Sequence, residues 1–292
     1  MRVAVYGRHF DPDFNKSIYD LFENFKRSDV EVFVFQPFYQ FFKEKINFQP
    51  DISGFFSNHM DIAKNLDLFL SIGGDGTFLE AITIVRDKGI PMVGINSGRL
   101  GFLANISREE LSDSIRDIFA NKYSLEERTM IKLETSGMAF KDFNYALNEV
   151  TIQKEGSTMI TIQTFVDNEF LNSYWADGLI ISTPTGSTAY SLSVGGPIVI
   201  PNSNNFIISP IAPHNLTVRP VVIPDFYELI LKVSGRSSKF IVTLDYRSEI
   251  IDSSIEIRIK RADFKIRILK LDRHNFFSTI RSKLMWGADK RN

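Results

Sequence analysis

Residues 66–77 read Leu-Asp-Leu-Phe-Leu-Ser-Ile-Gly-Gly-Asp-Gly-Thr, a short apolar run that ends in a glycine-rich turn. The run has the length of a buried strand, and Leu79, Ile82 and Val85 recur at helical spacing directly after the turn. A strand that turns into a helix is the repeating unit of a parallel sheet covered by helices. This stretch therefore predicts an α/β fold around itself.

The same alternation extends over about the first 120 residues. Strands are expected at 3–6, 30–35, 66–72 and 92–95, and helices at 12–25, at 38–46, from near Thr77 and at 107–119. Ser107 with Glu110 three residues later predicts a capping box at the start of the last helix. An N-terminal α/β domain over residues 1–125, carrying the Gly-Gly-Asp-Gly loop, follows from this pattern.

From about Met130 the strands follow one another without helices between them. The expected strands are 131–134, 146–153, 159–166, 170–173, 179–182, 206–209, 228–233, 240–244, 254–260 and 264–270, with a hairpin tip at 166–170. The run 255–260 alternates, which indicates a sheet with one solvated face; its Lys and Arg residues also allow a nucleic-acid surface, which we consider less favoured. We expect a mostly-β C-terminal domain over 126–270, and then a C-terminal segment, 271–292, with a helix at 276–285.

Composition excludes several classes of protein. The net charge of -1 gives no broad attraction to nucleic acid or anionic membranes, and the lack of cysteine excludes disulfides, Cys-ligated metals and thiol catalysis. No run approaches the ~20 apolar residues of a membrane helix, and the N-terminus lacks the pattern of a signal peptide. We therefore expect a cytoplasmic protein with neither a membrane nor a nucleic acid as partner.

The turn Gly73-Gly74-Asp75-Gly76-Thr77 is the strongest local signal for chemistry. Ligands of open α/β sheets bind outside the carboxyl ends of the strands, and glycines let the backbone approach an anion closely. Asp75 would lie beside the phosphate, where it could accept a hydroxyl proton or bind Mg²⁺. A plain strand-to-helix turn is the alternative. No P-loop or Gly-x-Gly-x-x-Gly motif is present.

Other candidates follow strand ends or lie within strands. Residues 177–197 run from an apolar strand into a stretch dense in Thr, Ser and Gly, which could bind sugar and phosphate oxygens while Tyr190 packs on a base. An ordinary polar loop with a capped helix is the alternative. Asn148-Glu149 and the loop 96–103 are weaker signals, and His214 near prolines is more typical of a structural role. Histidines and carboxylates at metal-ligand spacing are absent, so no residue is expected to ligate a structural metal directly.

These motifs together resemble the NAD kinases over nearly the whole chain. The similarity rests on Gly73-Gly74-Asp75-Gly76-Thr77, Asn96-x-Gly98-x-Leu100-Gly101-Phe102-Leu103, Asn148-Glu149, the block 177–197 with Thr-Pro-Thr-Gly-Ser-Thr-Ala-Tyr, Pro210 to Pro220, and Phe276-Phe277…Arg281-x-Lys283-Leu284-x-Trp286-Gly287. Diacylglycerol and sphingosine kinases share the first motif. The Thr-Pro-Thr-Gly-Ser-Thr block with Asn-Glu is much more specific.

The resemblance implies an enzyme that phosphorylates the 2′-hydroxyl on the adenosine ribose of NAD, using ATP with Mg²⁺ or another divalent cation. It implies the two-domain architecture of NAD kinases and diacylglycerol kinases, with a β-sandwich C-terminal domain, a last helix that returns to the first domain, and NAD bound between the domains. A homodimer or tetramer is implied as well.

The resemblance also implies roles for individual residues. Asp75 would be the general base, with a phosphate loop of Gly73, Gly74, Gly76 and Thr77. Asn148 and Glu149 would hold adenosine and ribose, Asp177 the nicotinamide half, and Phe102 would line the adenine pocket; residues 188–193 would bind NAD partly across a subunit interface. The full expected NAD-binding set is Asp75, Gly76, Phe102, Asn148, Glu149, Thr158, Trp175, Asp177, Thr188, Ala189, Tyr190, Ser191, Leu192, Ser193, Ala212, Tyr246 and Arg247.

Two places depart from the family pattern. Many members carry Gly-Gln after the position of Asp245, where this chain has Tyr246 and Arg247. Trp175 occupies a position that is often basic in bacterial relatives, and its indole can stack on a ring but cannot pair with a phosphate. Both changes bear on the contacts to NAD and on the preference between NAD and NADH.

Two other functions share part of the pattern. A lipid kinase of the diacylglycerol type has Gly-Gly-Asp-Gly but no reason to carry the Thr-Pro-Thr-Gly-Ser-Thr block. A non-catalytic NAD(P)-binding sensor would not need the base, and Asp75 with its glycines is intact. The sequence therefore favours an NAD kinase.

Overall fold

The computed structural model describes residues 1–98, 100–137 and 139–286, which form two compact units. The first unit is Met1–Glu127 together with the C-terminal segment from Ile266, and the second is Arg128–Lys265. The strands β7 (Tyr123–Thr135) and β18 (Ile257–Leu271) pass from one unit to the other. The expected domain limits at 125 and 270 fall inside these two strands and remain a prediction. Arg99 and Gly287, which the quoted motifs include, lie outside the described residues.

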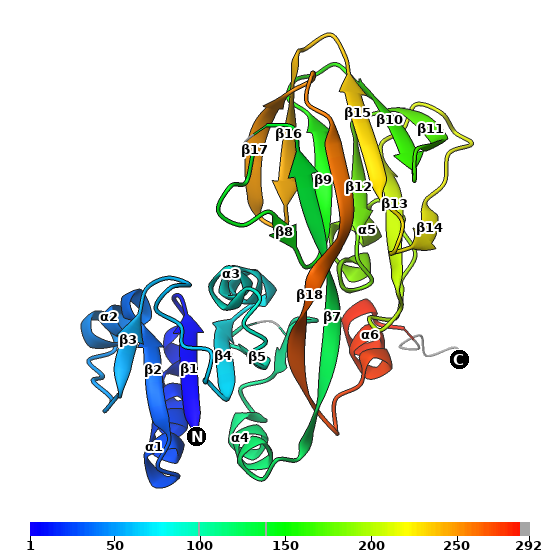
Figure 1. The fold of residues 1–292 in the computed structure, drawn as a ribbon. Coiled ribbons are helices and arrows are strands. Elements are labelled where there is room, and N and C mark those ends of the chain that lie inside the picture. The colour runs from blue at the N-terminus through cyan, green and yellow to red at the C-terminus, as the bar shows by residue number, and fades with distance from the viewer. Residues whose placement is uncertain (99, 138, 287–292) are drawn as a thin grey trace. The chain divides into compact units, whose positions relative to one another are not determined.

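The first unit is an α/β domain with a parallel sheet in the order β18-β5-β4-β1-β2-β3, and β6 pairs with β5 (Figure 1). Its strands are β1 (Arg2–Gly7), β2 (Glu31–Phe35), β3 (Gly54–Phe56), β4 (Leu68–Gly73), β5 (Met92–Asn96) and β6 (Ala104–Ile106). Its helices are η1 (Pro12–Phe14), α1 (Asn15–Arg27), α2 (Gln36–Lys45), α3 (Asp75–Val85), α4 (Leu111–Phe119) and α6 (Phe276–Leu284). The strands and helices expected from periodicity are present here, and only the start of α4 differs clearly from the prediction; β3 and β6, with three residues each, were not predicted.

The expected start of α4 was wrong. The helix begins at Leu111, and its N-cap is Glu110, whose side chain makes no cap hydrogen bond. The Ser107 hydroxyl and N–H both donate to the Glu110 carboxylate, at 3.2 and 3.4 Å. Because the serine oxygen donates to this carboxylate, only half of the predicted capping box is present, and residues 108–110 form a turn instead of a helical turn.

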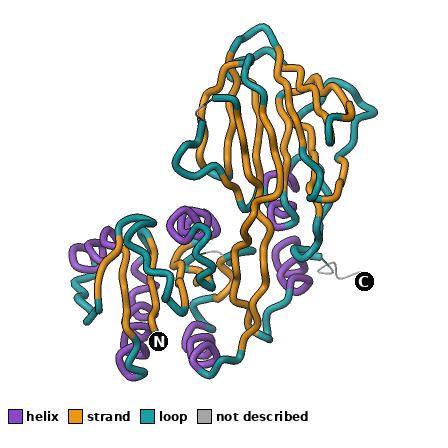
Figure 2. Tube along the Cα trace, in the orientation of Figure 1, coloured by secondary structure: helices purple, strands orange, loops and turns teal. Residues whose placement is uncertain are grey.

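The second unit is built almost only of strands, as Figure 2 shows by colour. Its elements are β8 (Tyr145–Ala146), β9 (Glu149–Lys154), β10 (Ile160–Val166), β11 (Glu169–Ala176), β12 (Gly178–Ser182), η2 (Thr185–Thr188), α5 (Tyr190–Ser193), β13 (Asn205–Ile211), β14 (Val221–Pro224), β15 (Leu229–Ser234), β16 (Lys239–Leu244) and β17 (Arg247–Asp252). One antiparallel sheet has the order β14-β13-β12-β9-β16-β17, and β11, β10, β15 and β18 follow one another in another. Side chains from both sheets form a single apolar core, so this unit is a β-sandwich.

Two expected strands of this unit differ from the structure. The run 146–153 is interrupted at Leu147-Asn148, between β8 and β9. The runs 254–260 and 264–270 instead form one strand, β18, because no glycine or proline separates them; the buried positions shift from odd-numbered residues (257, 259) to even-numbered ones (262, 266, 268) along it. The strands β14 and β17 were not predicted.

The hairpin expected at residues 166–170 is confirmed. Val166 pairs with Glu169, and the two residues between them, Asp167 and Asn168, have φ of 46° and 68°. Positive φ at both central residues is the type I′ geometry, whose twist matches that of the flanking strands. Among the described residues, no helix has the length and apolarity that crossing a bilayer would require.

Phenylalanine rings fill the interior of the first unit beside α1 and α2. The Phe42 ring is fully buried, and its centroid lies 4.3 Å from that of Phe38 and 5.6 Å from that of Phe22. Rings at these separations add to the free energy gained by burying their apolar area. The Phe-rich stretch of α2 is thus part of the core.

We expect Phe42→Ala to destabilise the first unit by about 3–5 kcal/mol, because the cavity it leaves cannot collapse fully. The thermal unfolding midpoint should fall by roughly 10 °C. The control is Phe55→Ala, whose ring is 51% exposed; we expect it to cost less than about 1 kcal/mol. Equal midpoints for the two variants would contradict this packing.

Candidate functional site

The carboxyl ends of β1, β4 and β5 bring two of the predicted loops together in the first unit. Gly73 at the end of β4 pairs with Asn96 at the end of β5, and the N–H of Ser97 donates to the Gly73 carbonyl at 3.4 Å. The turn Gly73–Thr77 and the loop 96–103 therefore adjoin each other. This edge is where ligands bind in open α/β sheets.

Asp75 is the first residue of α3, and its carboxylate joins the two loops. Its Oδ2 accepts a hydrogen bond from the N–H of Phe102 at 2.8 Å, and its Oδ1 accepts from those of Leu103 and Ala104 at 3.0 and 2.9 Å. The approach requires glycine at 101, since a Cβ there would lie 1.9 Å from Oδ1. Oδ2 accepts a single one of these bonds and keeps capacity for a further donor.

The glycines of the turn have different functions. Gly73 has φ of 153°, and an added Cβ would lie 2.4 Å from the Thr77 hydroxyl, so the turn itself requires glycine there. Gly74 and Gly76 are exposed, and an added Cβ at either would meet no atom within 4 Å. The backbone is therefore open on this side to a ligand. The phosphate loop that the resemblance implies consists of these glycines and Thr77, and this role remains a prediction.

A cavity of about 360 Å³ adjoins the same edge of the sheet. Its lining consists of Asp11, Asp13, Asn96, Ser97, Gly98, Leu100, Ser107, Arg108 and Glu109. The Asn96 side chain accepts from the N–H of Gly98 at 2.8 Å, which shapes the second loop. Phe102, expected near adenine, is half-buried, and the Lys283 ammonium of α6 lies 6.0 Å from its ring centroid.

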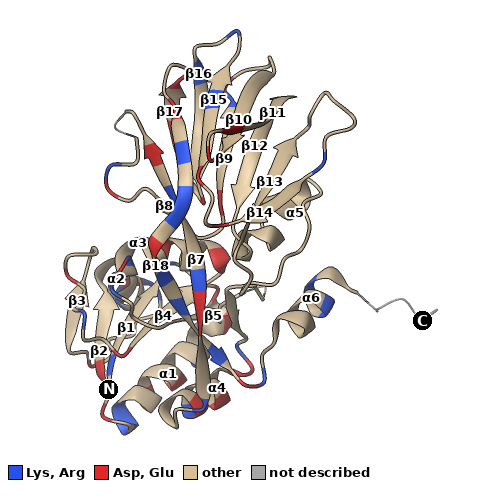
Figure 3. Ribbon diagram, turned by 45° about the vertical axis from the view of Figure 1, so that its right-hand side comes forward, with Lys and Arg blue, Asp and Glu red and all other residues tan. Residues whose placement is uncertain are grey.

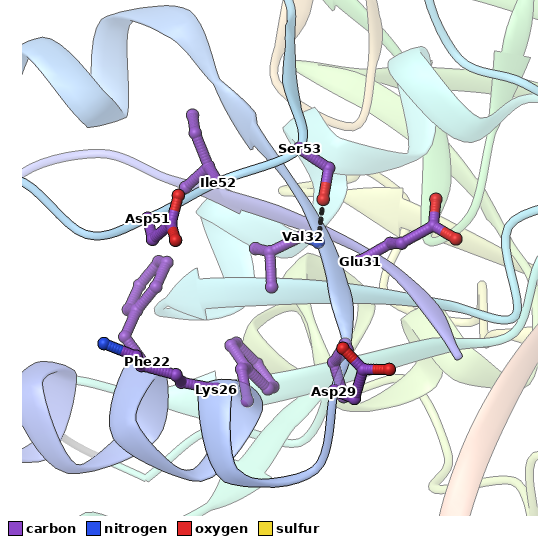
Figure 4. Close-up of a pocket in the computed structure, with 10 residues that line it drawn as sticks. Phe22, Lys26, Asp29, Glu31, Val32, Asp51, Ile52 and Ser53 are labelled. Atoms are coloured by element: carbon purple, nitrogen blue, oxygen red, sulfur yellow. Dashed lines mark hydrogen bonds between the residues drawn. The ribbon is translucent and has the colours of Figure 1, made fainter.

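A cavity of about 240 Å³ lies elsewhere in the first unit, beside α1 and the start of β2 (Figure 4). The hydroxyl of Ser53 accepts from the N–H of Val32 at 3.2 Å in its wall. Its lining includes none of the expected site residues and lies at the amino end of β2. It is therefore not part of the ligand-binding edge.

In the second unit, the Asp245 carboxylate makes the same kind of backbone contact as the Asp75 carboxylate in the first. Its carboxylate accepts from three successive N–H groups, those of Leu147, Asn148 and Glu149, at 2.9, 2.8 and 3.2 Å. Asp245 has φ of 55°, and its own N–H donates to the Glu149 carbonyl at 3.0 Å. These bonds explain why β8 and β9 are separate strands. Asp245 was not among the residues predicted for the site; the signal that could have identified it is a carboxylate directly after an alternating strand.

The Thr-Pro-Thr-Gly-Ser-Thr block packs against the same backbone. The Thr183 hydroxyl donates to the Leu147 carbonyl at 2.6 Å, and the Thr183 N–H donates to the Asn148 carbonyl at 2.8 Å. An added Cβ at Gly186 would lie 2.1 Å from that same carbonyl, so the close approach requires glycine. The two motifs that carry the most specific resemblance thus form one assembly.

Glu149 is buried in this assembly with only 6% of its surface exposed. Its Oε2 has no hydrogen-bond partner among the described residues. Burial and, next, the negative charge of Asp245 raise the pKa of Glu149 to about 8, against the opposing effect of the Tyr190 N–H. Burial also raises the pKa of Asp245, although the N–H groups of residues 147–149 oppose the shift. At neutral pH, Glu149 is therefore mostly protonated and can donate a hydrogen bond.

The expected NAD-binding residues at 188–193 lie in η2, in α5 and between them. Several of their hydroxyls already have partners: that of Thr188 donates to the Thr185 carbonyl at 3.2 Å, and that of Ser191 lies 3.1 Å from the buried Ser209 hydroxyl. The Tyr190 ring is 38% exposed, and its hydroxyl accepts from Gln153 at 3.2 Å. Ser193 is exposed, whereas Ala189 and Leu192 are half-buried.

Asp177 lies at the other end of β9 from Glu149. Its carboxylate forms an ion pair with Lys154 at 2.6 Å, and its carbonyl accepts from the Lys154 N–H at 3.0 Å. Glu149 and Lys154 are the two ends of β9, and five residue steps along a strand span about 17 Å. Tyr190 lies between these ends, because its N–H acts on Glu149 and its hydroxyl contacts Gln153.

Trp175 lies two residues before Asp177 in the chain, and its ring packs against that of His214. Their ring centroids lie 4.3 Å apart, the His214 N–H donates to the Trp175 carbonyl at 2.9 Å, and the indole is 51% exposed. Ala212, also expected at the site, has φ of 43° in the chain between β13 and His214. Thr158 is exposed in the turn after β9, beyond the Lys154 end of that strand.

The Arg247 side chain binds backbone carbonyls of the second unit. Its guanidinium donates to the carbonyls of Phe143 and Tyr145 and lies 5.2 Å from the centroid of the Phe143 ring. It also lies 5.8 Å from the centroid of Tyr246, whose side chain is 45% exposed. Arg247 therefore supports the chain that leads into β8. In the described ranges, no three His, Cys, Asp or Glu side chains gather as a metal site.

Comparison with known families gives two matches along the chain. Residues 27–123 match the ATP-NAD kinase N-terminal domain, and residues 147–271 match the ATP-NAD kinase C-terminal domain. Curated relatives named NAD kinase include those of Cytophaga hutchinsonii, 46% identical over 293 residues, and Bacteroides fragilis, 44% identical over 294 residues. Each alignment covers 100% of this chain and of the relative.

Two solved structures have a similar fold. Yeast NADH kinase complexed with NADH matches with a TM-score of 0.86 at 23% identity, over 99% of this chain and 88% of that one. An NAD kinase from Archaeoglobus fulgidus in complex with ATP matches with a TM-score of 0.74 at 28% identity, over 97% and 99%. At 23% identity, the similarity to the yeast NADH kinase shows a shared fold and nothing more.

The raised pKa of Glu149 makes a pH-dependent contribution to stability. Between its ordinary value of 4.5 and about 8, the unfolded chain releases a proton that the folded chain keeps. The free energy of unfolding therefore falls as pH rises through this window. Outside the window, the contribution of Glu149 to it does not change with pH. We expect Glu149→Gln to gain stability relative to the parent protein as pH rises from about 5 to 8, by an amount on the order of a few kcal/mol.

Thermal unfolding midpoints measured across this pH range would show the gain. Glu155→Gln is the matched control, since Glu155 is exposed in the turn after β9. We expect this control to follow the parent protein at every pH. Parallel pH profiles for Glu149→Gln and the parent would contradict the prediction.

Proposed function

The chain belongs to the NAD kinase family, and we propose that it transfers the terminal phosphoryl group of ATP to the 2′-hydroxyl on the adenosine ribose of NAD, giving NADP and ADP. The observation that carries this proposal is the placement of Asp75. Its carboxylate lies in the Gly-Gly-Asp-Gly turn, with three N–H groups of the second loop fixing its orientation and open glycines on either side.

Asp75 is proposed as the general base. A ribose hydroxyl is a weak nucleophile, and a carboxylate within hydrogen-bond reach helps by accepting its proton. The hydrogen bonds to residues 102–104 hold the side chain in one orientation, and Oδ2 retains acceptor capacity for the hydroxyl. Positioning of this kind is the main contribution of a protein to phosphoryl transfer.

The turn Gly73–Thr77 is proposed to bind phosphate oxygens of ATP through its backbone. Phosphoryl transfer also requires neutralisation of the triphosphate charge, which Mg²⁺ supplies when bound to the donor. Mg²⁺ usually binds through substrate phosphates together with one or two carboxylates and several waters. We propose that the phosphates of ATP supply most of its ligands.

The second unit is proposed to bind NAD. Protonated Glu149, with its unpartnered buried oxygen, suits a ligand that offers both donors and acceptors, such as the ribose and adenine of adenosine. Asn148 lies beside it, and the roles expected for Asp177, Trp175, residues 188–193, Ala212, Tyr246 and Thr158 are retained as proposals. Arg247 is proposed to act through Phe143 and Tyr145.

The specific block Thr183–Thr188 favours NAD as the acceptor over a lipid. Its threonine and glycine residues pack on the backbone of residues 147–148, so the block supports the residues proposed to bind adenosine. A lipid acceptor has no adenosine for these residues to bind. This is the physical reason to prefer an NAD kinase over a diacylglycerol-type kinase.

We further propose a cytoplasmic homo-oligomer, a dimer or tetramer, that binds neither nucleic acid nor a membrane. Lys and Arg residues recur along β18 (Figure 3), and the ion pairs that they form with acidic residues argue against a nucleic-acid surface. Arg258 pairs with Glu256 and Glu228, Lys260 with Glu134, and Lys270 with Glu126. Charges paired in this way leave little net field to attract a phosphate backbone.

The proposal is tested by incubating the purified protein with ATP, Mg²⁺ and NAD, and reading NADP with an NADP-specific dehydrogenase. We expect NADP and ADP to form in equal amounts. Tight NAD binding without NADP formation would instead indicate a sensor.

We expect Asp75→Asn to keep its fold and to lose about 10²–10⁴-fold in kcat, the usual contribution of a general base. Asp113→Asn is the control, because Asp113 lies in the first turn of α4 as Asp75 does in α3. Its kcat should match the parent enzyme. Near-normal turnover of folded Asp75→Asn would remove Asp75 from the mechanism.

We expect Gly101→Ala to reduce kcat as well, because its Cβ would displace the Asp75 carboxylate. If Gly101 acts through Asp75, the double variant with Asp75→Asn should be little slower than Asp75→Asn alone. The four enzymes of this cycle, compared by kcat and by thermal midpoint, test the coupling. Additive losses would show that Gly101 has a separate role.

A further inference from the structure

Arg8 is a charged residue at the carboxyl end of β1, the edge of the sheet that carries the turn Gly73–Thr77, and no motif includes it. It follows β1 directly, and Gly7 of β1 pairs with Ile72 of β4 in parallel register. One residue further along, Arg8 is therefore level with Gly73, where the phosphate turn begins. Parallel strands end at the same edge of a sheet, so Arg8 and the turn share that edge.

The Arg8 side chain is anchored to α3. Its Nε donates to Oε2 of Glu80 at 2.7 Å, and the hydroxyl of the buried Tyr6 donates to the same oxygen at 2.9 Å. Burial and, next, the charge of Glu80 raise the pKa of Tyr6, so its hydroxyl remains a donor. The buried Tyr6 thus fixes the Glu80 carboxylate, and this carboxylate in turn fixes the Arg8 guanidinium.

The anchor places Arg8 on the side of α3 that also carries Gly76. Glu80 lies four residues after Gly76, so the two share a face of α3, and helical side chains lean toward the N-terminus of their helix. An added Cβ at Gly76 would meet no atom within 4 Å. The guanidinium is therefore held on the face of α3 where Gly76 leaves the backbone accessible.

Among the described residues, Arg8 uses one of its donors in the bond to Glu80. A guanidinium has five N–H donors, and the bond to Glu80 uses the one on Nε. The side chain is 57% exposed. The four donors on the two Nη atoms form a planar fork of the kind that binds phosphate oxygens in pairs.

We infer that Arg8, held by Glu80 beside Gly76, binds the terminal phosphates of the nucleotide donor. The phosphates would be bound on one side by Arg8, which follows β1, and on the other by the backbone N–H groups of the turn at the start of α3. The role rests on the proposed function, since it names the residue that orients the donor of that reaction. The same fork would bind any unesterified phosphate chain, including inorganic tripolyphosphate.

The test is Arg8→Gln, assayed by initial rates with ATP and NAD varied separately. A lost hydrogen bond to a charged group corresponds to about a 10- to 100-fold loss. We expect kcat/KM for ATP to fall by that factor, while the KM for NAD changes by less than about twofold. Inorganic tripolyphosphate, used as a competitive inhibitor against ATP, should bind the variant about 10-fold more weakly or worse.

Arg2→Gln is the matched control. Arg2 lies at the opposite end of the same strand and pairs with Glu31 at 3.4 Å. It should leave both KM values unchanged. If Arg8→Gln behaves like Arg2→Gln, or if it lowers the thermal midpoint and raises both KM values alike, Arg8 has only a structural role.

Two further variants keep the test decisive should Arg8→Gln fold poorly. Arg8→Lys keeps the charge but loses the planar fork, and should recover part of kcat/KM for ATP. Glu80→Gln keeps an acceptor for Arg8, and should affect kcat/KM for ATP less than Arg8→Gln does. Full activity in Arg8→Gln and Arg8→Lys alike would overturn the inference. A parent enzyme that forms no NADP would instead refute the proposed function.

Discussion

One interaction occurs in both units, and the proposed binding loops of each unit depend on it: a carboxylate that accepts hydrogen bonds from three successive backbone N–H groups. Asp75 binds residues 102–104 in the first unit, and Asp245 binds residues 147–149 in the second. Such N–H groups lack partners in a sheet or helix at these positions, and leaving them buried and unpaired would be costly. The carboxylates satisfy them and at the same time fix the loops.

The glycines and hydroxyls around these carboxylates follow from the close approach of the chain. Gly101 is required because the backbone of the second loop lies against Asp75, and Gly186 because the Thr/Ser block lies against the carbonyl of Asn148. Thr183 closes the second assembly with its hydroxyl. The burial that results also raises the pKa of Glu149, so structure and protonation state have a common origin.

The regular elements were largely predictable, and the errors have physical causes. Periodicity located α1, α2 and α3 and most strands, because their buried faces repeat every 3.6 or 2 residues. It missed β3 and β6, which are too short to show a period. It placed the start of α4 at Ser107, where a side chain that could cap a helix instead donates to Glu110. It divided β18 in two, although no residue there stops a strand.

The sequence alone determined the fold class, the order of the elements and the motifs that mark the family, because these depend on local patterns and on residue types at fixed spacing. It also identified Asp75, Asn148 and Glu149 as candidates. Only the tertiary structure identified Asp245 and Arg8, since their partners lie about 100 and 70 residues away in the chain, respectively. It also decided that Arg247 binds backbone carbonyls. Contacts between distant residues depend on strand register and packing, which no local pattern encodes.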